Sequence, residues 1–220
     1  MKPHVLSLPF KRPNDNRILN YIWYTFYMNI QSPSYVLIEN ALPKEYLEIV
    51  LNKIKENGLV EEHPFSNFEG IKIDYSLIDP DNKIQKIIND AEKYFREHYV
   101  TAGRELVLSR SYGTIMNYGA LLEPHKDLYN SGREHDFSYG DALVCNIYLS
   151  DCVGGELVFP EIEASIKVNA GDVVLFPGYL LTHSVNMVKG GSRTTILNHF
   201  SLLSEEDTKN IDSIAEKLKK

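Results

Sequence analysis

A histidine and an aspartate two residues apart, His125 and Asp127, are the first pair in the chain whose types and spacing could bind a metal ion. They lie among short, turn-bounded apolar runs, which are typical of β-strands. Side chains at positions i and i+2 of a strand point to the same face, so the imidazole and the carboxylate can reach one point. Such a pair is common by chance, and it predicts a metal site only if a further ligand comes from elsewhere in the chain.

A third candidate ligand, His183, lies in an expected strand, and Arg193 follows it by ten residues. If the strands close into a barrel, both side chains can face its interior. Two imidazoles and one carboxylate on one face of a metal leave three positions open, which is typical of non-haem Fe(II) oxygenases. A structural zinc site is instead closed by four ligands, commonly thiolates. Cys145, expected inside a strand, and Cys152, expected in the turn after it, are not placed for that role.

Arg193 indicates the kind of ligand that such a barrel would hold. An unpaired guanidinium inside an apolar barrel is costly, and no acidic residue near it in the sequence is an obvious partner. A dicarboxylate co-substrate would satisfy it, because one end could chelate the metal while the planar fork of Arg193 held the far carboxylate.

The elements that must position these groups are expected to form one catalytic domain over residues 35–220, preceded by an N-terminal extension over residues 1–34. A strand is expected at 35–39. Helices are expected to open at Pro43 and after Asp81, because apolar residues recur at i, i+3, i+4 and i+7 in each. The domain is then divided into helical support over 35–104, a β core over 105–203 and a C-terminal helix over 204–220.

From Glu105 onward the apolar period changes to two and β-branched and aromatic residues dominate, which predicts an all-β sandwich or barrel. Turns are expected at the glycines, including residues 189–191. The polar stretch 129–140 is a candidate lid, because so long a loop inside a compact barrel is usually functional or mobile. The expected strands cover residues 106–118, 122–127, 142–149, 156–159, 165–168, 172–176, 182–188 and 193–202.

The composition describes an acidic chain of 220 residues with a net charge of -7. This balance argues against broad binding to nucleic acids or anionic membranes, which requires clustered Lys and Arg. Two cysteines and no visible secretory signal favour a reduced intracellular setting. The aromatic run at 21–30 is too short to span a membrane. We therefore expect a soluble, cytoplasmic protein with neither nucleic-acid nor membrane partners.

Several motifs accompany these residues in a fixed order. They are NYG and PHKD within 117–127, IYLSD at 147–151, GGELVFP at 154–160, AGDVVLFP at 170–177, and His183 with Arg193 ten residues on. With these motifs the sequence resembles the Fe(II)/2-oxoglutarate-dependent dioxygenases, and most closely the prolyl 4-hydroxylase-like branch. The resemblance implies a mainly β fold with supporting helices, in which a double-stranded β-helix (jelly-roll) barrel carries N-terminal helices and a C-terminal helix.

The resemblance also implies a role for each candidate residue. Iron would be bound by His125, Asp127 and His183. Arg193 would take the far carboxylate of 2-oxoglutarate. Further co-substrate positions would be Tyr148, which would donate its hydroxyl to the same carboxylate, and Tyr118 and Val185, which would line the pocket. The implied cofactors are Fe(II), 2-oxoglutarate and O2, with ascorbate as an additional reductant.

The implied reaction hydroxylates an unactivated C–H bond and releases succinate and CO2, with a prolyl residue in a protein or peptide as the first candidate substrate. One departure puts that substrate in doubt. Prolyl hydroxylases of this branch often carry a substrate-binding arginine where this chain has Gly140 and Asp141, although Arg133 in the preceding loop is a candidate substitute. His199, six residues after Arg193, is either a substrate contact or a core histidine.

Other readings stay open from the sequence. The substrate can be another amino-acid side chain or a free amino acid. A nucleic-acid demethylase of the same superfamily would carry a second arginine where His199 stands. A cupin-like metalloenzyme would not need Arg193, and a binding module could keep the metal and the jelly roll without turnover.

Overall fold

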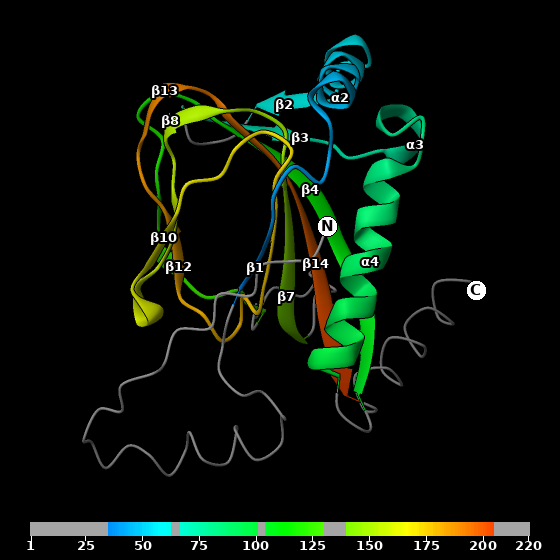
Figure 1. Ribbon diagram of the computed structural model, residues 1–220, viewed down its shortest axis with the longest axis vertical. Helices are drawn as coiled ribbons and strands as arrows, with labels where there is room; N and C mark the ends of the chain where they lie inside the picture. Colours follow the sequence, from blue (N-terminus) through cyan, green and yellow to red (C-terminus); the bar gives the residue numbers. More distant parts are fainter. Residues whose placement is uncertain (1–34, 63–66, 101–103, 130–139, 205–220) are drawn as a thin grey trace.

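The computed structural model describes residues 35–62, 67–100, 104–129 and 140–204, and the structural statements below refer to these ranges (Figure 1). The expected N-terminal extension and C-terminal helix, and residues 130–139 of the candidate lid, lie outside them. The element order is β1 (Val36–Ile38), α2 (Lys44–Glu56), β2 (Val60–Glu62), β3 (Phe68–Ile71), α3 (Tyr75–Ile78), α4 (Lys83–His98), β4 (Arg104–Met116), β5 (Leu122–His125), β6 (Leu128–Tyr129), β7 (Gly140–Tyr148), β8 (Cys152–Gly154), β9 (Leu157–Phe159), β10 (Ala164–Ile166), β11 (Val173–Phe176), β12 (His183–Val185), β13 (Val188–Gly191) and β14 (Arg193–Ser204).

Most of the described strands form two facing sheets, as expected for a jelly roll, and β8 and β13 form a separate two-stranded sheet (Figure 1). The large sheet has the order β1-β11-β7-β14-β4-β3-β2, with β6 added beside β7, and the small sheet has the order β10-β9-β12-β5. All of the strand pairs in these sheets are antiparallel. The predicted mainly β, double-stranded β-helix fold is confirmed.

Strand β7 shows how the two faces of the large sheet differ. Cys145 and Ile147 pack in an apolar cluster with the helices, whereas Val144 and Tyr148 pack in a second cluster between the two sheets. This alternation follows from the period of two along a strand. The large sheet is therefore buried on both faces, and the space between the sheets is the barrel interior.

The helices cover the outer face of the large sheet (Figure 1). Helix α2 buries a stripe at i, i+1, i+4 and i+8, and α4 buries one at i, i+4, i+7 and i+11, formed by Ile84, Ile88, Ala91 and Phe95. The buried carboxylate of Asp79 accepts hydrogen bonds from the backbone N–H groups of Ile84 and Gln85, at 3.0 and 2.8 Å. A carboxylate at this position satisfies the first free donors of α4 and complements its dipole.

Several elements differ from the sequence prediction. Strands β2 and β3 and the short helix α3 were not expected, because their short segments carry no clear period. The strand expected over 182–188 is divided into β12 and β13, and residues 189–191, expected as a turn, continue β13 where it pairs with β8. Cys152 therefore starts a strand, not a turn.

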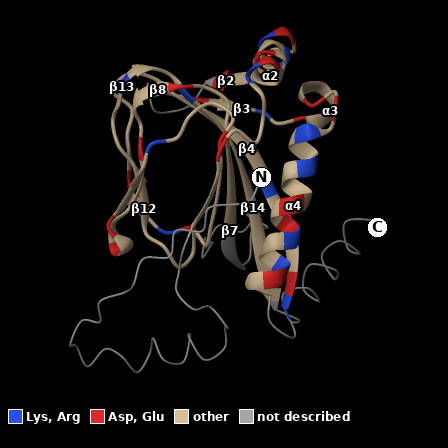
Figure 2. Cartoon of the chain, in the orientation of Figure 1, with Lys and Arg blue, Asp and Glu red and all other residues tan. Residues whose placement is uncertain are grey.

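The surface charges are mixed in sign. Figure 2 shows Lys and Arg interspersed with Asp and Glu along α4, where Lys86 pairs with Asp90 at 2.7 Å and Arg96 pairs with Glu92 at 2.8 Å. Among the described helices, none is long and apolar enough to cross a membrane.

Candidate metal centre

The two histidines of the site come from neighbouring strands of the small sheet. Strands β5 and β12 pair so that His125 lies directly opposite His183. Asp127 follows β5 by two residues, and its backbone N–H donates to the carbonyl of Gly178 at 3.0 Å. Antiparallel pairing thus brings together residues that are far apart in the sequence, and it places both imidazoles on one face of the sheet.

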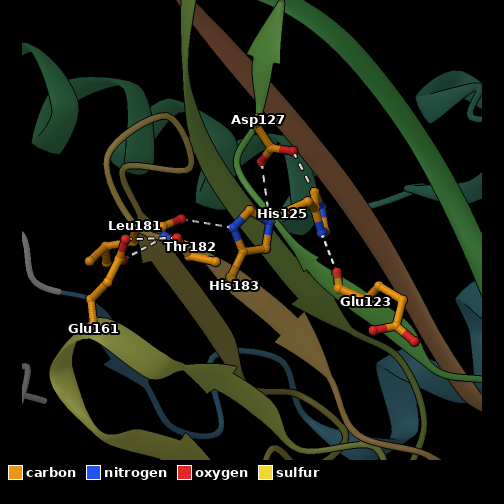
Figure 3. Close-up of polar contacts among 7 residues, drawn as sticks. All are labelled: Glu123, His125, Asp127, Glu161, Leu181, Thr182 and His183. Atoms are coloured by element: carbon orange, nitrogen blue, oxygen red, sulfur yellow. Dashed lines mark hydrogen bonds and ion pairs between the residues drawn. The ribbon is translucent and has the colours of Figure 1, made fainter.

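The three side chains converge on one point (Figure 3). Asp127 Oδ1 lies 3.7 Å from His125 Nε2, and Asp127 Oδ2 lies 3.4 Å from His183 Nε2. One ligand atom of each residue lies within 4.8 Å of the others, and the described residues contain no other such group of three. Two imidazole nitrogens and a carboxylate are the donor set of a metal site with open positions.

Backbone carbonyls fix the orientation of both rings (Figure 3). His125 Nδ1 lies 2.8 Å from the carbonyl oxygen of Glu123, and His183 Nδ1 lies 3.1 Å from that of Leu181. Because a carbonyl can only accept, each Nδ1 carries the hydrogen and each Nε2 presents its lone pair towards Asp127. This is the tautomer that a metal-binding histidine needs.

The ligands differ in exposure. The side chains of His125, Asp127 and His183 are 37%, 13% and 7% exposed, so one side of the site is open and the other is enclosed. Burial lowers the pKa of His183, and the nearby Asp127 carboxylate opposes that shift in part. A lowered pKa keeps His183 in the neutral form that binds a metal.

Gly178 leaves the space that Asp127 occupies. A Cβ atom at this position would lie 2.4 Å from Asp127 Oδ2 and 2.8 Å from Val144 Cγ2, so any side chain here would have to displace them. The absent side chain and the backbone hydrogen bond from Asp127 together set the direction of the carboxylate. The residues present therefore fit a metal ion such as Fe(II), with two histidines and one aspartate as ligands.

Arg193 lies in the same barrel interior and is only 4% exposed. Its Nη2 donates to the Tyr148 hydroxyl at 3.2 Å, and its Nη1 donates to Thr195 Oγ1 at 3.1 Å and lies 3.6 Å from Met116 Sδ. The guanidinium carbon also lies 4.9 Å from the centre of the Tyr148 ring. All of these partners are uncharged.

The guanidinium is therefore incompletely satisfied. Arg193 Nε is buried and has no hydrogen-bond partner, and among the described residues no carboxylate forms an ion pair with the side chain. A buried charge without a counter-ion is strongly unfavourable. The group consequently fits an anionic ligand, and the far carboxylate of 2-oxoglutarate has the charge and planar geometry that a guanidinium binds.

The other three residues predicted to bind the co-substrate differ in burial. Tyr148 is fully buried beside Arg193, and burial raises the pKa of its phenol while Arg193 lowers it in part. Val185 packs in the apolar cluster inside the barrel. Tyr118 is 74% exposed, so the structure does not bring it into that cluster. The pocket-lining roles of Val185 and Tyr118 remain predictions.

His199 is buried on β14, and its ring packs edge-on against Tyr112 with the ring centres 5.5 Å apart. Burial lowers its pKa to about 4, which keeps the imidazole neutral. Arg110 in turn lies over the Tyr112 ring, 4.2 Å from its centre. Arg133, the candidate substitute for the missing arginine, lies outside the described residues.

Sequence reasoning did not single out four polar or aromatic residues near these groups. Thr195 accepts a hydrogen bond from Arg193, and Asn146 lies two residues before Tyr148 on β7. Arg110 and Tyr112 lie beside His199. Thr195 and Asn146 each lie two positions from a predicted site residue on the same strand, and that spacing was the signal that could have identified them.

Comparison with protein families supports the resemblance that the sequence motifs indicate. Residues 113–201 match the model of the 2OG-Fe(II) oxygenase superfamily. This segment carries the superfamily pattern. It contains His125, Asp127, His183 and Arg193, and the predicted resemblance to the 2-oxoglutarate-dependent oxygenases is confirmed. No curated protein sequence matches the chain.

Several solved structures share the fold of this chain at low sequence identity. A viral collagen prolyl hydroxylase from Paramecium Bursaria Chlorella virus-1 is 18% identical, with a TM-score of 0.58, and the alignment covers 76% of this chain and 94% of that one. A Pseudomonas putida prolyl-4-hydroxylase is 14% identical, with a TM-score of 0.59 and coverage of 77% and 93%. A prolyl hydroxylase from Trichoplax adhaerens, in complex with a hypoxia inducible factor peptide fragment, is 14% identical, with a TM-score of 0.57 and coverage of 87% and 94%.

Proposed function

We propose that this protein is an Fe(II)- and 2-oxoglutarate-dependent dioxygenase that hydroxylates an unactivated C–H bond, with release of succinate and CO2. The observation that carries the proposal is the pairing of two sites in one barrel. One is the convergent cluster of His125, Asp127 and His183, and the other is the buried Arg193 that has no carboxylate partner among the described residues. A cupin or a structural metal site would have no use for the second.

Different groups of residues would bind the metal and the co-substrate. His125, Asp127 and His183 would hold Fe(II) on one face, which leaves the open face for co-substrate and O2. Bound iron and 2-oxoglutarate would supply the activation of O2, with ascorbate as an additional reductant. The apolar walls of the barrel would exclude water from the reaction.

At the inner end of the pocket, Arg193 and Tyr148 would hold the far carboxylate of 2-oxoglutarate. The guanidinium offers a planar pair of donors, and the phenol adds one more. Burial keeps the Tyr148 phenol protonated, so it can act as a donor. This end of the site would orient the co-substrate and select a five-carbon diacid by length.

We propose a prolyl residue in a protein or peptide as the substrate, because three proteins that share this fold are prolyl hydroxylases and one of them is in complex with a peptide fragment. Hydroxylation of another amino-acid side chain or of a free amino acid is the alternative. It is favoured by the lack of an arginine at residues 140–141, where prolyl hydroxylases often carry one. A metal-binding jelly roll without turnover is the remaining alternative, and the cytoplasmic location stays a prediction.

The first test is co-substrate binding. Anaerobic addition of 2-oxoglutarate to the Fe(II)-loaded protein should produce a visible charge-transfer band. Asp127→Ala, which lacks one ligand, should give no band. A colourless complex in the unaltered protein would contradict the proposal.

The second test identifies the substrate. Succinate release from 2-oxoglutarate should be measured with proline-containing peptides, with peptides in which alanine replaces proline, and with free amino acids. Stimulation by the proline peptides alone, together with a mass increase of one oxygen on the peptide, would support prolyl hydroxylation. Stimulation by a free amino acid would favour the alternative, and the absence of stimulated or basal succinate release would favour the module without turnover.

A further inference from the structure

Helix α4 and the edge strand β1 border a groove on the outer face of the large sheet. Its floor is formed by Val36 and Ile38 of β1 and by the residues that pair with them on β11, Leu175 and Val173. The groove has a volume of about 370 Å³, which is within the range that proteins use to hold a small ligand. Neither the metal ligands nor Arg193 line it, so it is separate from the site described above.

The wall of the groove is an apolar part of α4. Ile87 and Tyr94, at i and i+7, line the groove with Ala91 between them. Residues at this spacing share one face of a helix. Ile87 and Tyr94 are only half-buried, so this face of α4 keeps apolar surface that the described segments do not fully cover.

Strand β1 is also incompletely paired. It is the outermost strand of the large sheet and pairs only with β11 among the described strands. An edge strand offers free backbone N–H and C=O groups to any other strand, and exposed apolar surface beside it favours association with other molecules. Natural proteins commonly cover such an edge with another segment, so a covering segment is expected here.

The segment that precedes β1 has the composition that such a groove requires. Residues 18–30 read ILNYIWYTFYMNI and carry no charge, and all except Asn20, Thr25 and Asn29 are apolar or aromatic. The run is too short to span a membrane, which takes roughly 20 residues. Burial against an apolar surface of the protein would remove its side chains from water.

The groove is within reach of this segment, because the two are close in the chain. Tyr35, the first described residue, stacks on Phe159 with the ring centres 5.4 Å apart, and Val36 already lines the groove. Ile30 is six residues before Val36 and can therefore lie at most about 22 Å from it. A tether of this length gives an effective concentration on the order of millimolar, so even a weak interaction is enough for docking.

We propose that residues 18–30 dock in the groove between β1 and α4 of their own chain, with Trp23 among the side chains that fill it. Trp23 is the largest side chain of the segment and has the most apolar surface to bury. The docked segment covers the apolar face of Ile87 and Tyr94 and shields the free edge of β1. This inference is independent of the proposed function, because the groove lies on the outer face of the large sheet and the metal ligands lie in the barrel interior.

The fluorescence of Trp23 tests the proposal directly, because it is the only tryptophan of the chain. In the unaltered protein its emission should lie at shorter wavelength than that of free tryptophan. Acrylamide should quench it roughly five- to tenfold less, because the undocked form is a minor state of about 10%. In Ile87→Glu, which places a charge in the apolar groove, the emission should move to longer wavelength and the quenching should rise by the same factor.

Asn89→Glu is the matched control, since it adds the same residue to α4 at an exposed position outside the groove lining. It should leave the emission and the quenching of Trp23 unchanged. Ile87→Ala removes apolar surface from the groove and keeps a residue that favours a helix. It should change both quantities in the same direction as Ile87→Glu but by less, and it replaces that variant if Ile87→Glu does not fold.

A second measurement reports on the groove itself. Trp23→Asp should uncover the groove, so a dye that fluoresces in apolar surroundings should bind to this variant more strongly than to the unaltered protein. Adding Ile87→Glu to Trp23→Asp should remove most of the additional binding, because the dye then loses its apolar site. Equal binding of the dye by the unaltered protein and by Trp23→Asp would overturn the inference, since the groove would be open in both.

Three results for Trp23 would also overturn it. Quenching as strong as that of free tryptophan would show that the segment is exposed and would leave the groove to an external apolar ligand. Shielding that persists unchanged in folded Ile87→Glu would place the segment elsewhere. Shielding that is lost on dilution would assign the groove to the segment of a second copy, since docking within one chain does not depend on protein concentration.

Discussion

The two ends of the barrel interior are built on opposite principles. At the metal end, each histidine has its Nδ1 bound to a backbone carbonyl, and the ligand atoms already converge. At the other end, Arg193 and Asn146 each keep a buried atom without a partner. The metal end is therefore already oriented by contacts within the protein, whereas the arginine end lacks a charged partner among the described residues.

Because of this difference, the metal and the co-substrate should have different effects on the two ends of the site. A preformed site loses little on binding, because its groups are already oriented. An incomplete site gains stability from its ligand, since the ligand supplies the missing partner. Substitutions at the metal end should consequently alter metal affinity, and substitutions at the arginine end should alter co-substrate affinity without harm to the metal-free fold.

The largest effect is expected for Asp127→Ala. Loss of a ligand should weaken metal binding by more than about 100-fold, because even outer partners of a metal ligand contribute 10- to 100-fold. Metal content after dialysis and succinate release both report the change. Asp151→Ala is the control, since Asp151 is exposed and, within the described part of the chain, its carboxylate accepts only from the backbone N–H of Ala170, at 2.8 Å. Stoichiometric iron in Asp127→Ala would contradict the assignment.

Arg193→Met should have the next largest effect, on the opposite end. The affinity for 2-oxoglutarate should fall by about 100-fold, the equivalent of about 3 kcal/mol, because a buried charged hydrogen bond is removed. The thermal midpoint of the metal-free protein should not fall, since the guanidinium has no carboxylate to lose among the described residues. Calorimetry and thermal unfolding measure the two quantities. A lower thermal midpoint together with an unchanged affinity for 2-oxoglutarate would contradict the role proposed for Arg193. Arg193→Lys should retain part of the affinity for 2-oxoglutarate.

Gly178→Ala should weaken metal binding by about tenfold, because the new Cβ would displace the Asp127 carboxylate. Discrimination between 2-oxoglutarate and 2-oxobutyrate, which lacks the far carboxylate, should be unchanged. Metal titration followed by ligand binding tests both points. Gly190→Ala is the control, since its Cβ would meet only the Val153 side chain among the described residues, at 3.4 Å from Cβ and 3.5 Å from Cγ2, which are ordinary contacts. An unchanged metal affinity in Gly178→Ala would show that Asp127 can move freely.

Thr195→Val should have the smallest effect. The change keeps the side-chain shape and removes the acceptor of Arg193 Nη1, so the guanidinium is less firmly held. The affinity for 2-oxoglutarate should fall by about fivefold, which corresponds to one neutral hydrogen bond. Metal affinity should not change. The control is Thr194→Val, on the other face of β14, which should change neither the metal affinity nor the affinity for 2-oxoglutarate. A loss of metal affinity in Thr195→Val would show that the two ends are not independent.

Much of this arrangement could be predicted from the sequence, because the strands of the core carry a clear period of two. The long strands β4, β7 and β14 and the helices α2 and α4 were expected with nearly these bounds. The three candidate metal ligands were predicted from spacing and resemblance, and the structure brings their side chains together. Arg193 was expected to be buried, as it is.

Other features depend on contacts between distant segments that no local pattern contains. Strands β2 and β3 exist because β3 pairs with β4 and β2 pairs with β3. The division of the strand expected over 182–188 follows from separate partners, β5 and β9 for β12 and β8 for β13.

The register between β5 and β12 has a practical consequence for anyone who refolds or engineers this protein. His125 and His183 oppose each other only in the native alignment of the two strands, and a slip of one residue would turn one imidazole to the outside. Tight metal uptake therefore reports more than occupancy. It measures the fraction of molecules in which the small sheet has closed correctly, and a simple colorimetric titration can serve as a quality assay for every variant.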